Sequence, residues 1–199
     1  LEKRNLLDIL RNFILYETEK DIGKRIKKVA RYQQFRAVNK ALHKLVNGKD
    51  TLSRGGVIFH TQGSGKSLTM VLLARKLRRT PQLNDATIVV VTDRIDLDKQ
   101  IYNTFLRTLS TITTPIRAES VKEMKGLLSR AQPQIIMTTI HKFQSDTEEA
   151  LRDEQQGKSL LLDKDFEVLT LKSNVIVLAD EAHRSQYTGV ARNMRQALP

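Results

Sequence analysis

The segment His60–Ser67 (HTQGSGKS) constrains the fold most, because it places a glycine-rich turn between two different structural patterns. The residues before it, Gly56–Phe59, form a short apolar run that predicts a strand. Residues 68–79 have the apolar spacing of a helix. A glycine turn between a strand and a helix is the context in which backbone N–H groups surround a phosphate. The pattern therefore predicts an α/β domain with a phosphate-binding loop.

Each residue type in this loop suits one part of a bound nucleoside triphosphate. Glycines let backbone N–H groups turn toward phosphate oxygens with no Cβ in the way. The residues expected to form this cradle are Gln62, Gly63, Ser64 and Gly65. Lys66 would bring its charge to the β- and γ-phosphates, and the Ser67 hydroxyl would bind Mg²⁺. His60 stands where the usual pattern has its first glycine, and an ordinary glycine-rich turn is the alternative interpretation.

A second polar group, Asp180-Glu181-Ala182-His183, directly follows the apolar run Val175–Ala179. If that run is a parallel strand, its carboxyl end lies at the edge where such sheets bind ligands. We expect Asp180 to hold Mg²⁺ and Glu181 to polarise the attacking water, with a solvated acidic turn as the alternative. For His183 the hypothesis is a role in coupling the nucleotide state to nucleic-acid contacts, against a histidine that is simply hydrogen-bonded.

The rest of the core alternates strands with helices. The β-branched runs Thr87–Thr92 and Ile135–Thr139 predict two further strands, and helical spacing covers residues 97–109 and 120–130. Strands separated by helices predict parallel crossovers. The expected fold class is α/β, a mostly parallel sheet with helices on both faces.

The two flanks of this core differ from it. Residues 1–17 and about 29–46 predict two helices, separated by a basic stretch. We therefore expect a helical lead-in over residues 1–48 and the main domain over residues 49–199. The polar residues 145–173 are expected to form a surface insertion.

Composition limits the classes of function. The chain has 34 Lys and Arg against 22 Asp and Glu, a net charge of +12. This balance indicates a polyanionic partner, since release of counterions from phosphates favours binding, with improved solubility as the alternative. The absence of cysteine excludes disulfides and thiolate metal sites, and it fits a cytoplasmic location. No apolar run approaches the ~20 residues of a membrane helix, and a start at Leu1 rather than Met favours a segment of a longer protein.

Three strings of the sequence together resemble one family. They are His60–Ser67, Val91–Gln100 (VTDRIDLDKQ) and Ala179–Tyr187 (ADEAHRSQY). A phosphate loop followed by Asp-Glu-Ala-His is similar to superfamily-two helicases and translocases, and the longer strings resemble the restriction subunit of type I restriction-modification enzymes. The resemblance runs from about Leu6 to Pro199. It implies a first RecA-like motor domain, a three-layer sandwich that hydrolyses ATP with Mg²⁺ to translocate double-stranded DNA. The implied partners are modification and specificity subunits.

The resemblance also implies roles for residues outside the two motifs. Gln34, in Arg31-Tyr32-Gln33-Gln34, matches a glutamine that reads the adenine edge, to which an amide can both donate and accept. Two strand-end segments match loops that grip the nucleic-acid backbone. The residues expected to do so are Thr92, Arg94, Thr139, His141 and Lys142. For each of these residues an ordinary solvated position is the alternative.

Some parts that the resemblance implies are expected outside these residues. The family's next motif lies on a strand that we expect after Pro199 in the sequence. In the sheet of related folds, that strand sits between the strand before the phosphate loop and the strand before the acidic pair. Without it the sheet should have a central gap. A second motor domain would supply an arginine finger, worth on the order of 10³–10⁵ in rate, so this segment alone should hydrolyse ATP slowly. DNA cleavage is assigned to the parent protein. Two other hypotheses are an RNA helicase of the same superfamily and a non-catalytic basic module with a degenerate nucleotide site.

Overall fold

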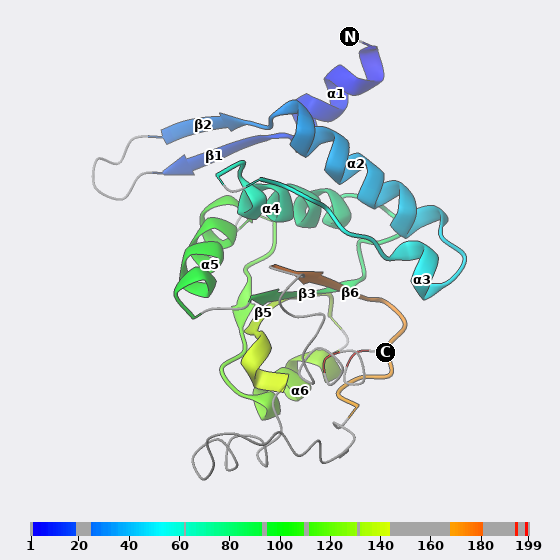
Figure 1. Cartoon of the computed structure of the whole chain (residues 1–199), viewed down its shortest axis with the longest axis vertical. Helices are drawn as coiled ribbons and strands as arrows, with labels where there is room; N and C mark the ends of the chain where they lie inside the picture. The colour runs from blue at the N-terminus through cyan, green and yellow to red at the C-terminus, as the bar shows by residue number, and fades with distance from the viewer. Residues whose placement is uncertain are drawn as a thin grey trace. The chain divides into compact units, whose positions relative to one another are not determined.

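The computed structural model describes seven stretches of the chain. They are residues 2–18, 25–61, 63–92, 95–109, 112–130, 132–143 and 168–180, together with Met194 and Leu198. The chain divides into two compact units, one of residues 1–86 with 100–115 and the other of residues 87–99 with 116–199. Each unit has its own helices and strands, most of which Figure 1 labels.

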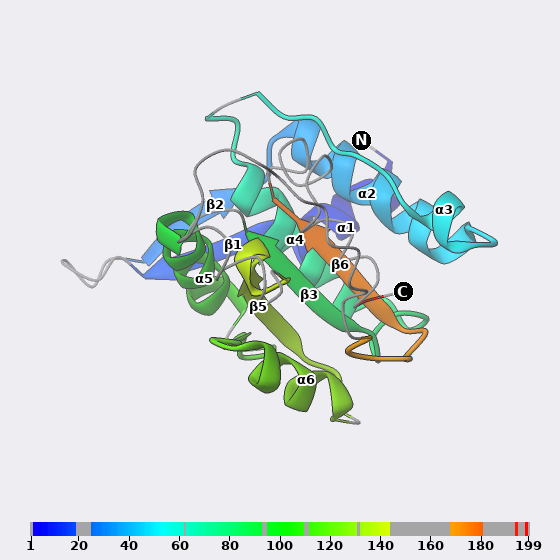
Figure 2. The same ribbon diagram turned by 60° about the horizontal axis from the view of Figure 1, so that its bottom comes forward.

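The second unit contains a four-stranded sheet in the order β4-β5-β3-β6, and all of its pairings are parallel. Figure 2 shows β5, β3 and β6 side by side. The strands are β3 (Thr87–Thr92), β4 (Ile116–Arg117), β5 (Ile135–Thr139) and β6 (Val175–Ala179). Every residue of β3 and β5 is buried, as expected for β-branched strands inside a parallel sheet. The predicted α/β class and the mostly parallel sheet are confirmed.

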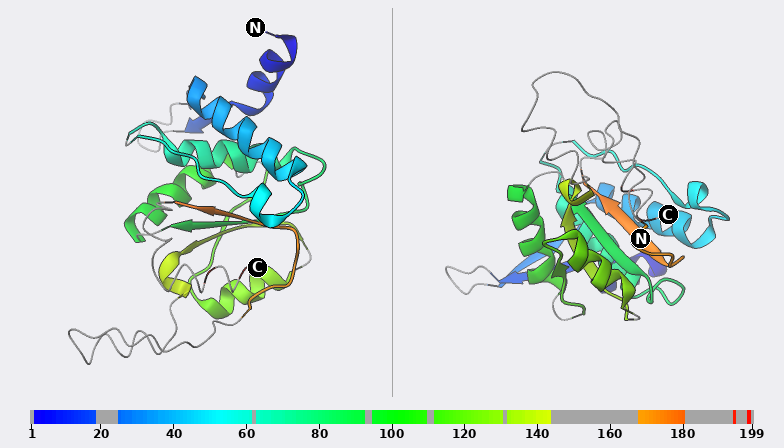
Figure 3. Two further views of the ribbon diagram at one scale, coloured as in Figure 1. Left: turned by 45° about the vertical axis from the view of Figure 1, so that its right-hand side comes forward. Right: turned by 90° about the horizontal axis from the view of Figure 1, so that it is seen from below.

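One face of this sheet packs against helix α6 (Val121–Ser129), which runs along it in Figure 3. The helix begins where it does because the Ser120 hydroxyl accepts a hydrogen bond from the Glu123 backbone N–H, at 3.1 Å. Side chains alternate between the two faces of a strand, so every second residue of β3 meets the helix. The shared core includes Val89, Val91, Met124, Leu127, Leu128, Ile136, Ile140, Phe143 and Leu169. Each such fully buried side chain contributes about 1.5–3 kcal/mol.

The first unit combines helices with a two-stranded antiparallel ribbon. Its elements are α1 (Lys3–Asn12), β1 (Ile14–Thr18), β2 (Arg25–Val29), α2 (Tyr32–Asn47), α3 (Thr51–Arg54), α4 (Lys66–Arg78) and most of α5 (Ile95–Leu109). Helix α2 packs against α4 and α3, and α1 contacts β1 and α4. The predicted helices over residues 29–46, 68–79, 97–109 and 120–130 are confirmed as α2, α4, α5 and α6.

A buried cation ties α1, α2 and α4 together. Lys76 of α4 is 8% exposed, and its ammonium donates to Asp8 Oδ2 at 2.5 Å and to Asn39 Oδ1. The same ammonium lies 5.0 Å from the centroid of the Phe13 ring. Two acceptors and an aromatic face therefore compensate for the water that the ammonium lost on burial. This contact fixes the N-terminal helix on the helix that follows the glycine loop.

Replacing Asp8 with alanine is expected to lower the free energy of unfolding by about 2 kcal/mol, because the Lys76 ammonium stays buried with one charged partner fewer. Urea denaturation followed by circular dichroism measures the loss. Asp8→Asn keeps an oxygen acceptor and should lose less. Glu2→Ala removes an exposed acid beside the same helix and is the matched control. Equal midpoints for Asp8→Ala and Glu2→Ala would show that the Lys76–Asp8 contact adds no stability.

The prediction of one helix over residues 1–17 is wrong. Helix α1 ends at Asn12, where the Phe13 N–H donates to the Ile9 carbonyl, and residues 14–18 form β1. The basic stretch pairs with it as β2, from Ile14 opposite Val29 to Thr18 opposite Arg25. The helical spacing of the apolar residues did not reveal this, because ladder hydrogen bonds depend on a partner strand and not on local periodicity.

The strand predicted at Gly56–Phe59 is not formed. Val57 and Phe59 are 74% and 89% exposed, and no described strand pairs with this segment. A strand is stabilised by hydrogen bonds to a neighbour, so an extended segment without one stays irregular. The neighbour expected from sequence beyond Pro199 stays a prediction.

Two further predictions have no test in the described part of the chain. The predicted insertion over residues 145–173 is described only from residue 168 onward. The division at residue 48 stays a prediction.

Candidate functional site

The glycine-rich loop enters α4 directly, since Gly65 is the N-cap and Lys66 the first helical residue. Gly63 and Gly65 have φ angles of 76° and 88°. These angles lie in the left-handed region, which residues with a Cβ rarely adopt. A Cβ on Gly65 would also lie 2.8 Å from the Gln34 side-chain nitrogen. The φ angle and the nearby Gln34 amide therefore both favour glycine at position 65.

Hydrogen bonds hold the shape of this loop from both ends. The backbone N–H and the hydroxyl of Ser64 both donate to the Thr61 carbonyl, at 3.2 and 2.6 Å. The backbone N–H and the hydroxyl of Thr69 both donate to the Gly65 carbonyl, at 3.0 and 3.2 Å. These four hydrogen bonds fix the described residues of the loop.

Gln34 joins the loop to the start of α2. Its side chain is 2% exposed, and Nε2 donates to the Gly65 carbonyl at 3.1 Å. Its Oε1 accepts from the backbone N–H of Arg31 at 2.9 Å, which caps α2. An amide has two N–H donors and two acceptor sites, so half of this capacity is used inside the protein. The predicted contact with adenine would have to use the other half, and it stays a prediction.

The loop fits a bound phosphate. The first N–H groups of α4 have no carbonyl partner within the helix, and the helix dipole adds positive potential at the same end. Lys66 and Ser67 are half-buried there. A Cβ on Gly63 would meet no atom within 4 Å, so this side of the loop is open. Just before the loop, the His60 Nε2 atom is buried with no hydrogen-bond partner among the described residues.

In the second unit the carboxyl ends of three strands lie at one edge of the sheet. Thr92 of β3 pairs with Thr139 of β5, and Val91 pairs with Ala179 of β6. The Asp180 backbone N–H continues this pairing by donating to the Val91 carbonyl at 2.8 Å. The sheet edge thus brings Thr92, Thr139 and Asp180 together. Such edges are where parallel sheets bind ligands, and Asp180 follows β6 as the sequence predicted.

Two of the predicted nucleic-acid contacts are buried in this structure. Thr92 and Thr139 are 1% and 6% exposed, and the Thr92 hydroxyl donates to the Thr138 carbonyl at 3.4 Å. The Thr92 hydroxyl is thus used inside the sheet, and contact of either threonine with phosphate stays a prediction. Lys142 is half-buried in the 3-10 turn η1 (Ile140–Phe143).

The other predicted site residues fall outside the described part of the chain. They are Gln62, Arg94, Glu181 and His183, together with the side chain of His141. Within the described residues, no group of three or more His, Asp or Glu side chains is placed to hold a metal ion. The predicted Mg²⁺ ligands Ser67 and Asp180 belong to different units and stay a prediction. No described helix has the length and apolar character needed to cross a bilayer.

Comparison with known proteins identifies the family of the chain that carries the glycine loop. Residues 33–199 match the family model of the SWI2/SNF2 ATPase. The chain belongs to the SWI2/SNF2 ATPase family. A type I restriction enzyme HindI endonuclease subunit from Haemophilus influenzae is 39% identical over 100% of this chain and 19% of that protein. A putative type I restriction enzyme MjaIXP endonuclease subunit from Methanocaldococcus jannaschii is 34% identical over 100% and 17%.

A third relative is matched over most of its own length. The C-terminal part of a putative type I restriction enzyme MpnIIP endonuclease subunit from Mycoplasma pneumoniae is 31% identical over 94% of this chain and 84% of that protein. The predicted resemblance to the restriction subunit of type I enzymes is confirmed. This member of the SWI2/SNF2 ATPase family spans about a fifth of the length of the first two relatives.

One contributor to the site was not predicted from the sequence. Thr69 fixes the loop through two hydrogen bonds to Gly65. The signal was present, since a threonine four residues after a helix N-cap can return its hydroxyl to the N-cap carbonyl.

Proposed function

We propose that this SWI2/SNF2 ATPase segment is the first motor domain of a DNA translocase, which binds and hydrolyses ATP with Mg²⁺ to move double-stranded DNA within a type I restriction complex. One observation carries the proposal. The chain, a member of an ATPase family, has a loop with two left-handed glycines at the N-terminus of α4, and its relatives are type I restriction endonuclease subunits. Figure 1 shows α4 following this loop in the first unit.

The loop residues would hold the triphosphate. Backbone N–H groups of Gln62, Gly63 and Gly65 would face its oxygens, while that of Ser64 already donates to the Thr61 carbonyl. Lys66 would bring a positive charge to the β- and γ-phosphates. Ser67 and Asp180 would hold Mg²⁺, which neutralises phosphate charge when bound. Glu181 would orient and polarise the water, and Gln34 would read adenine through its remaining donor and acceptor sites. The hydrogen bond from Gln34 to the Gly65 carbonyl supports its place in this site.

The edge of the parallel sheet would contact the nucleic acid. The proposed contacts are Thr92, Arg94, Thr139, His141 and Lys142, and His183 would couple them to the nucleotide state. Phosphate contacts of this kind position a strand without reading its sequence. Cleavage of DNA and recognition of a site would belong to other parts of the enzyme and to its modification and specificity subunits, in the cytoplasm.

The test of this function is ATP hydrolysis by the intact protein that contains this segment. Duplex DNA should stimulate hydrolysis, and RNA should not. Replacing Glu181 with glutamine should lower the rate at least ~10²-fold and leave ATP binding unchanged, since general-base catalysis contributes about 10²–10⁴. Glu119→Gln changes an exposed glutamate of the same unit and is the matched control.

Three outcomes would contradict the proposal in different ways. An unchanged hydrolysis rate in Glu181→Gln would show that Glu181 has no part in the chemistry. Stimulation by RNA and not by duplex DNA would favour the RNA helicase. Absence of ATP binding by the unmutated protein would favour the basic module with a degenerate nucleotide site.

A further inference from the structure

The stretch from Arg25 to Lys49 contains no acidic residue. It carries eight cations, namely Arg25, Lys27, Lys28, Arg31, Arg36, Lys40, Lys44 and Lys49. The net charge of the whole chain is +12, so this stretch supplies most of it. None of the residues proposed above to hold ATP or to contact DNA uses this charge. A concentration of one sign on adjacent elements calls for a partner of the opposite sign.

The ribbon turns part of this charge outward. Tyr16 of β1 is directly opposite Lys27 of β2, and Arg25, two residues before Lys27, shares their face. The Arg25 guanidinium carbon lies 4.4 Å from the centroid of the Tyr16 ring, and Tyr16 is 47% exposed. Leu15 points to the other face and is 2% exposed. The face with Tyr16, Arg25 and Lys27 is therefore the outer face of the ribbon.

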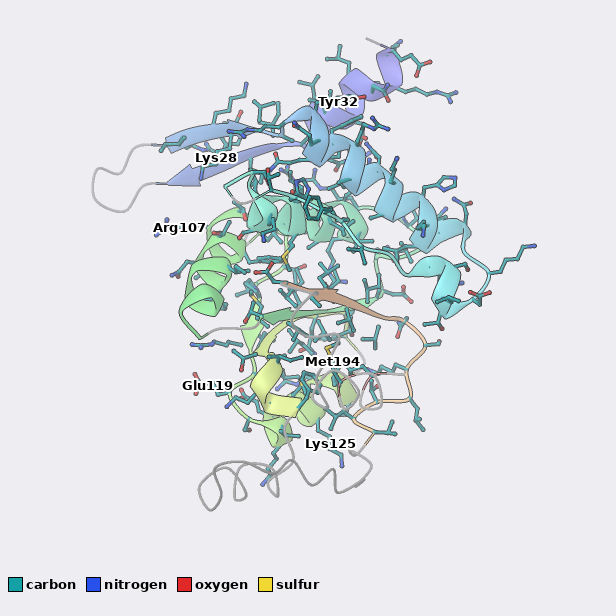
Figure 4. The ribbon with its side chains drawn as sticks, in the orientation of Figure 1. Lys28, Tyr32, Arg107, Glu119, Lys125 and Met194 are labelled. Carbon is teal, nitrogen blue, oxygen red and sulfur yellow. The ribbon has the colours of Figure 1, made fainter. Side chains whose placement is uncertain are left out.

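Helix α2 repeats this combination of a tyrosine with cations. Tyr32 is 69% exposed, and the Arg36 guanidinium carbon lies 5.8 Å from its ring centroid. Arg36 and Lys40 are both exposed. A spacing of four residues places Tyr32, Arg36 and Lys40 in one row, with a rise of about 6 Å between neighbours. Figure 4 labels Lys28 on β2 and Tyr32 at the start of α2, and only Ala30 and Arg31 separate the two elements.

The contacts of these cations favour a nucleic acid over other polyanions. Among the described residues, no acid pairs with Arg25, Lys27, Arg36 or Lys40, and the partners of the two arginines are aromatic rings. A guanidinium over a ring keeps its charge and can still donate to phosphate. Exposed aromatic rings between cations are the surface on which single-stranded bases stack. An anionic membrane is bound instead by cations beside a wide apolar face, and binding to anionic vesicles distinguishes that case.

We propose that Tyr16, Arg25, Lys27, Tyr32, Arg36 and Lys40, here named the ribbon–helix surface, bind a nucleic-acid strand. The cations would pair with phosphates, and the two tyrosines would stack on unpaired bases. This surface is separate from the sheet edge to which the proposed function assigns nucleic-acid contacts. The inference rests on the proposed function only in that the bound polymer is a nucleic acid.

Binding of labelled oligonucleotides to the full chain, measured by fluorescence anisotropy at several NaCl concentrations, tests this surface. Arg25→Glu with Lys27→Glu should weaken binding of single-stranded and duplex DNA at least ~10-fold. Each phosphate contact adds about 1 to the magnitude of the slope of log K against log salt concentration. Losing two contacts should therefore lower that magnitude by about 2. Lys122→Glu with Arg130→Glu makes the same change of charge at exposed positions of the second unit and is the matched control. Arg25→Gln with Lys27→Gln, which introduces no acid, should give the same direction of change.

A separate substitution tests whether Tyr16 stacks on bases. Tyr16→Ala should weaken binding of single-stranded DNA by about 5- to 10-fold and binding of duplex DNA by less than twofold, since stacking requires an unpaired base. Tyr16→Phe keeps the ring and should restore binding. The urea midpoint of each variant, compared with that of the unmutated chain, separates lost binding from lost folding.

Several results would contradict the proposal that the ribbon–helix surface binds nucleic acid. Equal losses of DNA affinity in the Arg25/Lys27 double variant and in the Lys122/Arg130 control would show a general effect of net charge. Loss of binding to phosphatidylserine vesicles, with oligonucleotide binding unchanged, would assign the surface to a membrane. If the intact protein still hydrolyses ATP in response to DNA while the ribbon variants bind normally, the surface assignment fails and the proposed function stands. If the unmutated protein neither binds DNA nor responds to it, both fail.

Discussion

Replacing Lys66 with alanine is expected to weaken ATP binding at least ~100-fold, a loss of about 2.7 kcal/mol. Lys66 is the first residue of α4, directly after the left-handed Gly65, and its side chain is half-buried. Its ammonium would be the strongest point charge that the loop offers to a triphosphate, and burial reduces the screening of that charge by solvent. The backbone N–H groups would remain and would account for residual binding. Titration with a fluorescent ATP analogue measures the change.

Two controls separate this effect from general damage to the chain. Lys122→Ala removes an exposed lysine from α6 and should leave ATP affinity unchanged. The urea midpoint of Lys66→Ala should lie close to that of the unmutated chain. Unchanged ATP affinity in a folded Lys66→Ala protein would show that the glycine loop is not the nucleotide site.

The sequence predicted the buried strands well and the ribbon not at all. Thr87–Thr92 was predicted with the bounds that the structure has, because a run of β-branched residues that is buried on both faces leaves few alternatives. Ile14 instead continued the helical spacing of α1, and its actual partner, Val29, follows more than ten residues later. Periodicity reports local structure, so it missed this non-local pairing. The prediction of a strand at Gly56–Phe59 was wrong for the same reason, because a local pattern does not show whether a neighbouring strand is present.

The chemistry of the site stays a prediction, and its contacts were only partly predictable. The sequence predicted a sharp turn of the backbone at Gly63 and Gly65 from the glycine motif and its place before a helix, and both residues have positive φ. The hydrogen bond from Gln34 to Gly65 was not predicted, since 31 residues separate the two and the adenine interpretation assigned that amide to a ligand. Whether Ser67 and Asp180 share a metal ion depends on the relative placement of two units, which no local sequence pattern contains.

Replacing Gly65 with alanine is expected to lower the free energy of unfolding by about 3 kcal/mol. About 1–2 kcal/mol comes from placing a residue with a Cβ at φ 88°. The remainder comes from Gln34, because the new Cβ would lie 2.8 Å from its Nε2 and displace the amide. The displaced Gln34 would lose its hydrogen bonds to Gly65 and Arg31, each worth about 1 kcal/mol. Urea denaturation measures the loss.

Gly63→Ala provides a control that isolates the second contribution. Gly63 has a similar φ of 76°, but a Cβ there would meet no atom within 4 Å. Its loss should therefore be about 1–2 kcal/mol, from backbone strain alone. In a Gln34→Ala background the clash is absent, so adding Gly65→Ala should cost no more than Gly63→Ala costs in the unmutated chain. A coupling energy near zero between positions 34 and 65 would mean that Gln34 does not hold the loop, because contacting residues that share hydrogen bonds couple by about 0.5–3 kcal/mol.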